Sequence, residues 1–90
     1  MEKDVKILIK NTCEYARLST WAIGSAPKDI LKKTALKINE KIQGILNCDA
    51  DAINDNEFVD IIIYANMVRR AAGLKEISLT NYKTENNFGL

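Results

Sequence analysis

The fold is decided at Ile53-Asn54-Asp55-Asn56-Glu57-Phe58, six residues that carry the complete start signal of an α-helix. Asn54 is the predicted N-cap, because its side-chain oxygen can accept a hydrogen bond from a free backbone N–H of the first turn. Glu57 can accept in return from the Asn54 N–H, and Ile53 and Phe58 can close over the turn as a hydrophobic staple. The sequence therefore predicts a last long helix from Asn54 or Asp55 to Ala72, ended by Gly73.

This last helix is apolar on more than one side. Six residues share one face at 100° per residue: Phe58, Ile61, Ile62, Ala65, Val68 and Ala72. A second set covers much of the rest: Val59, Ile63, Tyr64, Met67 and Ala71. Two other helices of about 20 residues cannot wrap such a helix completely. We therefore expect an interface with a second copy of the chain or with another protein, formed by Val59, Ile63, Tyr64, Met67 and Trp21.

Two helices are predicted before it, over residues 3–23 and 27–47. The second carries an apolar seam with spacings of four and three residues, made of Leu31, Ala35, Ile38, Ile42 and Ile45. The connection is short, with Gly24 at a position where φ is usually positive, so the two helices should form an antiparallel hairpin. The predicted fold is all-α: a small three-helix domain over residues 1–74, made of this hairpin and the long third helix. An irregular C-terminal tail over residues 75–90 follows, partly docked or mobile.

Composition and charge exclude several classes of function. The formal net charge is only +1, so the chain lacks the broad positive field of a typical nucleic-acid binder. No apolar run approaches the roughly 18 residues of a membrane span, and we expect no signal peptide, because the apolar cluster Ile7-Leu8-Ile9 is only three residues long. Cys13 and Cys48 lack the spacing of a zinc site or a disulfide scaffold. We therefore expect a cytoplasmic protein with reduced thiols.

The sequence offers few residues suited to catalysis or to metal binding. The chain has no histidine, which removes the commonest general base, and it has no Gly-rich phosphate loop. Asp49, Asp51 and Glu57 resemble part of an EF-hand calcium loop, but the segment is about three residues too short and lacks the central glycine. We expect no catalytic residue, no cofactor and no metal site.

Two basic groups are candidates for binding anions. Lys33, Lys37 and Lys41 lie on the side of the second helix opposite its seam, where they are either solubilising charges or phosphate contacts. Arg69 and Arg70 end the third helix, where they either complement the helix dipole or form a guanidinium fork for a phosphate or carboxylate. Asp60 can pair with Arg70 only between antiparallel copies of the helix.

Two short pieces, Tyr15-Ala16-Arg17-Leu18-Ser19 and Met67-Val68-Arg69-Arg70-Ala71, resemble small phage proteins that sequester cyclic nucleotides of bacterial defence. The size and helical pattern of the chain are similar to those of bacteriocin immunity proteins, which are small cytoplasmic helical bundles with a trailing C-terminal segment. Both resemblances imply a protein that binds a target and blocks or buffers it, and neither assigns a functional residue.

The sequence thus predicts a non-catalytic, homo-oligomeric interaction module, a small regulator or inhibitor of the phage or plasmid type. It would bind a partner protein through apolar helix faces. Two alternatives remain open: an oligomeric binder of an anionic nucleotide ligand, and a nucleic-acid-associated protein that uses the lysines of the second helix.

Overall fold

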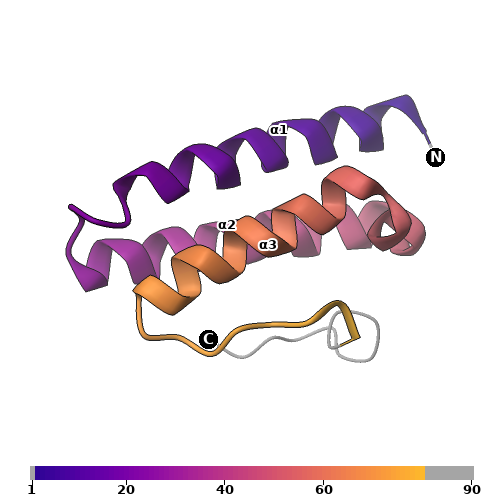
Figure 1. Ribbon diagram of the computed structural model, residues 1–90. Helices are drawn as coiled ribbons and strands as arrows, with labels where there is room; N and C mark the ends of the chain where they lie inside the picture. Colours follow the sequence, from indigo (N-terminus) through magenta and orange to yellow (C-terminus); the bar gives the residue numbers. More distant parts are fainter. Residues whose placement is uncertain (1, 81–90) are drawn as a thin grey trace.

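The computed structural model describes residues 2–80 and consists of three helices, α1 (Lys3–Ser19), α2 (Lys28–Cys48) and α3 (Asn56–Ala71). Short 3₁₀ helices, η1 (Thr20–Ala22) and η2 (Ala50–Asn54), join them. As Figure 1 shows, α1 and α3 run in the same direction and α2 runs opposite to both. The predicted all-α fold, with a helical hairpin and a third helix packed along it, is confirmed. Residues 81–90 of the predicted tail lie outside the described residues.

The core is formed by one apolar strip from each helix. Both predicted strips of α2 and α3 are buried: Leu31, Ala35, Ile38, Ile42, Ile45, Phe58, Ile61, Ile62, Ala65, Val68 and Ala72. Helix α1 adds Val5, Ile9 and Ala16 at helical spacing. Thr12 is also buried among them. Its hydroxyl group is not left without a hydrogen-bond partner, because it donates to the Leu8 carbonyl at 2.8 Å.

The first helix ends earlier than the sequence predicts. Its α-helical part stops at Ser19 and tightens into η1, and Gly24 has no positive φ. The hydroxyls of Ser19 and Thr20 donate to the carbonyls of Tyr15 and Arg17, at 2.8 and 2.7 Å. Such side-chain bonds compete with the helical backbone pattern, which accounts for the early change to a 3₁₀ turn.

The start of α3 lies one residue later than predicted. Asp55, with extended backbone angles, is the N-cap, and its Oδ1 accepts from the Glu57 N–H at 2.8 Å. Asn54 cannot fill that position, because residues 50–54 already form η2 and an N-cap needs a non-helical backbone. Ile53 and Phe58 do both pack in the core.

The end of α3 is a complete Schellman motif. The Leu74 N–H donates to the Arg69 carbonyl at 2.8 Å, and the Gly73 N–H donates to the Arg70 carbonyl at 3.1 Å. Gly73 has a φ of 78°, the only positive φ in residues 2–80, so the predicted stop at Gly73 is confirmed. The chain then turns back along α3 (Figure 1). Ile77 is buried against the core.

Residues 74–78, which we call the tail segment, have no regular secondary structure, as expected for the tail, whereas Leu79 and Thr80 have helical backbone. Across residues 2–80, no helix combines the length and the apolar character that crossing a bilayer requires.

Candidate interaction surface

The largest exposed apolar side chain is Trp21, in the turn between α1 and α2, with 74% of its surface accessible. The Arg17 guanidinium lies 5.7 Å from the centroid of its ring, a cation–π contact. Leu18, three residues before Trp21, is also exposed. We call Arg17, Leu18 and Trp21 the Trp21 surface.

The Trp21 surface is held in place from α1. The Arg17 guanidinium forms a two-bond ion pair with the Glu14 carboxylate, with an Nη2–Oε1 distance of 2.7 Å. This hydrogen bond lowers the pKa of Glu14 and raises the pKa of Arg17 relative to their ordinary values. Both groups therefore carry charge at neutral pH, and Glu14 orients the cation that lies over the indole ring.

The side of α3 that faces away from the core carries a second apolar patch. Ile63 and Met67 lie one turn apart and are 52% and 38% exposed. Asp60 and Arg70, both exposed, lie before and after them. We call Asp60, Ile63, Met67 and Arg70 the outer α3 surface. Val59 and Tyr64 flank this surface and are half-buried, so they present less apolar area than the sequence predicts.

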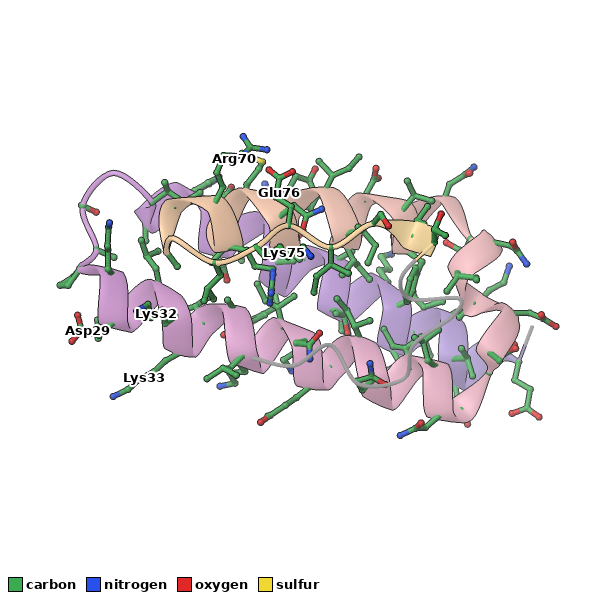
Figure 2. All side chains as sticks on the ribbon, turned by 90° about the horizontal axis from the view of Figure 1, so that it is seen from below. Asp29, Lys32, Lys33, Arg70, Lys75 and Glu76 are labelled. Carbon is green, nitrogen blue, oxygen red and sulfur yellow. The ribbon has the colours of Figure 1, made fainter. Side chains whose placement is uncertain are left out.

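Arg69 and Arg70 do not form one fork, which corrects the predicted paired site. Arg69 follows the buried face of α3 and is only 5% exposed, and its Nε donates to the Lys75 carbonyl at 2.6 Å. Arg70 lies on the outer side of α3, away from α2, and bonds to Glu76 through its Nε at 2.6 Å (Figure 2). The 100° turn between consecutive helical residues separates the two guanidinium groups. Arg69 thus binds the tail segment, and only Arg70 is accessible.

Two of the three lysines of α2 gather at one aromatic ring. The ammonium groups of Lys37 and Lys41 lie 5.6 and 5.1 Å from the centroid of the Tyr15 ring, so they gather where α2 meets α1. Lys33 points away from the bundle (Figure 2). The structure therefore brings together two of the three predicted residues, around the aromatic ring of Tyr15.

Neither thiol belongs to a metal site within the described part of the chain, where no group of three possible ligands lies together. Cys48 is exposed and Cys13 is half-buried. Burial raises the pKa of Cys13, and the nearby carboxylates of Asp60 and Glu57 raise it further. Cys13 is thus a protonated packing residue between α1 and α3.

Sequence reasoning missed three residues that make specific contacts: Glu14 and Arg17 beside Trp21, and Asn66 on α3. The signal for the first two was present, because Glu14 and Arg17 are three residues apart and Arg17 and Trp21 are four apart, which are the spacings of neighbours on a helix. Asn66 gave no such signal, because the residue to which its side chain bonds, Ile77, lies in the tail segment, 11 residues later.

Comparison with known proteins does not assign the chain to a family: no protein-family model, no curated protein and no solved structure matches it. The two resemblances noted from the sequence gain no support from these comparisons.

Proposed function

We propose that this protein is a non-catalytic helical interaction module, a small regulator or inhibitor that occupies a partner protein through the Trp21 surface. The observation that carries the proposal is the 74% exposure of Trp21. Burying an exposed indole ring in an interface is favourable, and tryptophan is one of the residues enriched at binding hot spots, where truncation to alanine costs about 2 kcal/mol or more.

The neighbours of Trp21 support the same role. Glu14 and Arg17 hold a cation over one face of the indole ring, so less side-chain freedom is lost when a partner covers the other face. Arg17 is also the kind of residue that is enriched at interfaces. The partner that fits this surface offers an apolar pocket of indole size with a polar rim.

The experiment has two stages. A photo-reactive benzoylphenylalanine replaces Leu18, beside Trp21, and captures the partner in the native cell, with the same group at Lys33 as the control position. The captured protein is then purified, and calorimetry measures its binding to wild type, W21A and K33A. Because Trp21 lies outside the core, W21A should fold like the wild type, which circular dichroism and the melting temperature verify.

We expect W21A to bind at least about 30-fold more weakly, which corresponds to about 2 kcal/mol, and K33A to bind like the wild type. Equal affinity of W21A and wild type for every captured protein would overturn the proposal.

A second candidate function is anion or nucleic-acid binding at the junction of α1 and α2. It is favoured by the gathering of Lys37 and Lys41 around Tyr15, which places two cations and an aromatic ring together. Titration with generic DNA and with a panel of nucleotides at low salt tests it. Binding that falls steeply with salt and is lost in K37A/K41A supports this function, and the absence of binding at low salt excludes it.

A further inference from the structure

We infer that the outer α3 surface is a two-fold symmetric contact with a second copy of this chain, in which the two α3 helices lie antiparallel and cross at the level of Ala65. This inference goes beyond the proposed function, because it concerns different residues and a different partner. It rests on the spacing, the exposure and the charges of Asp60, Ile63, Met67 and Arg70.

The four residues are arranged symmetrically about Ala65. Ile63 and Met67 each lie two residues from it, on opposite sides, and Asp60 and Arg70 each lie five residues from it. At 3.6 residues per turn, all four fall within a strip about 80° wide on the helix. A single two-fold axis at Ala65 therefore sets Ile63 level with the partner's Met67 and, in the same register, Asp60 level with the partner's Arg70. A two-fold interface requires such a self-complementary surface.

The charges favour the antiparallel orientation. Asp55, Glu57 and Asp60 give the first half of α3 a negative charge, and Arg69 and Arg70 give its last turn a positive charge. Antiparallel copies bring opposite charges and opposite ends of the helix dipoles together, whereas parallel copies bring like charges together. Among residues 2–80, Asp60 takes part in no ion pair within its own chain.

Arg70 can bind a carboxylate of the second copy while it keeps its ion pair with Glu76. The Nε of Arg70 donates to one carboxylate oxygen of Glu76, Oε1, and one Nη lies within ion-pair distance of the same oxygen. A guanidinium has five N–H donors in a planar fork, so its other edge remains available for a second carboxylate. The carboxylate of the partner's Asp60 is the group that the two-fold axis brings to this level.

The apolar contribution comes from Ile63 and Met67, which are 52% and 38% exposed in the single chain. Residues one turn apart on each helix can interdigitate with their copies on the other. One pair of helix faces is smaller than the standard interface of about 1,600 Å², so the dimer should be reversible and depend on concentration.

A charge exchange tests both the dimer and its register. Sedimentation velocity is measured from about 10 to about 500 µM, the range in which small interfaces associate. D60R places a cation level with the partner's Arg70, and R70D places an anion level with the partner's Asp60. Each single variant should associate at least about tenfold more weakly than the wild type, and D60R/R70D should recover the wild-type affinity.

Three further variants are controls. I63E/M67E should be monomeric, and K33E on α2 should associate like the wild type. E76Q removes the charge of Glu76 and thereby tests whether R70D acts only through the bond to Glu76. Wild type that stays monomeric throughout, or D60R/R70D that associates no better than the single variants, would overturn the inference. W21A should associate normally, so failure of the dimer and failure of partner binding at Trp21 are distinguishable.

A distance measurement tests the orientation independently. With Cys13 and Cys48 replaced by serine, a spin label at Asn56 is placed near the start of α3. The antiparallel arrangement puts the two labels about 27 Å apart along the helix axis, and a parallel one puts them about 10 Å apart. A pulsed electron resonance distance near 10 Å would overturn the inference.

Discussion

Asn66 and Ile77 are joined by two hydrogen bonds. The Asn66 Nδ2 donates to the Ile77 carbonyl at 2.7 Å, and the Ile77 N–H donates to the Asn66 Oδ1 at 2.8 Å. The side-chain amide of α3 thus pairs with the backbone of the tail segment as a neighbouring strand would. Together with the Arg69 bond to the Lys75 carbonyl, it docks Ile77 onto the core.

We predict that N66A releases this segment from α3. The substitution removes both bonds and leaves the Ile77 N–H and carbonyl in need of other partners, so we expect a loss of about 1–3 kcal/mol in the free energy of unfolding. Chemical denaturation measures this loss, and hydrogen exchange at the Ile77 amide should accelerate. N56A, at the exposed first residue of α3, is the matched control. Unchanged exchange at Ile77 would contradict this account of the docking.

The cap of α3 can be assigned by mutation. Because the Asp55 carboxylate accepts from the Glu57 N–H, D55A should lower the free energy of unfolding by about 1 kcal/mol. N54A, one residue earlier in η2, should have the smaller effect. If N54A lowered the free energy of unfolding more than D55A does, Asn54 would be the N-cap, as the sequence suggested.

Two glycines should respond to alanine with opposite signs. Gly73 has a φ of 78°, which an alanine adopts only with strain, so G73A should cost about 1 kcal/mol despite the open space around it. Gly44 lies inside α2 without a positive φ. Apart from its chain neighbours and the backbone of its own helix, no atom lies within 4 Å of the position that a β-carbon would take, so G44A should stabilise the protein by about 0.5–1 kcal/mol. Thermal unfolding of both variants gives the signs, and destabilisation by G44A would contradict the open surroundings of this glycine.

The two thiols should react with alkylating reagents at different rates. Burial, followed by the charges of Asp60 and Glu57, raises the pKa of Cys13 above its ordinary value of 9.0, and the thiolate is the reactive form. At pH 8, iodoacetamide should therefore modify Cys48 first, and D60N should accelerate the reaction at Cys13. D51N is the control, and mass spectrometry measures the rates. Faster modification of Cys13 than of Cys48 would contradict its half-buried placement.

The same raised pKa has a consequence for stability. A thiol whose pKa is higher in the folded than in the unfolded chain contributes stability that is full below 9.0 and is lost as the pH rises through the folded value. The free energy of unfolding should thus fall above pH 9.0 more steeply for the wild type than for C13S. Equal slopes for the two proteins would show that Cys13 does not contribute.

The core could be predicted from the sequence because it depends on periodicity alone. The seam from Leu31 to Ile45 and the strip from Phe58 to Ala72 repeat at helical spacing, and each strip is buried as a whole. Gly73 was equally predictable, since a Schellman motif requires a positive φ that glycine adopts readily.

The boundaries and the polar contacts could not be predicted in the same way. Asn54 and Asp55 are both good N-caps, and the choice between them depends on η2, whose 3₁₀ backbone occupies Asn54. Arg69 and Arg70 look alike in sequence, yet one is buried against the tail segment and the other is exposed, because the path of the chain after Gly73 decides which is covered. Such contacts depend on tertiary placement, which has no local signature.

We propose that this protein acts by association through the Trp21 surface, and chemical-shift mapping tests this proposal most directly. The ¹⁵N-labelled protein is titrated with the partner that photo-capture identifies, and perturbations of backbone amides and of the Trp21 indole N–H are recorded. We predict the largest changes at Arg17, Leu18 and Trp21. Changes centred instead on Lys37 and Lys41, or an indole signal that does not move when the partner binds, would contradict the proposal.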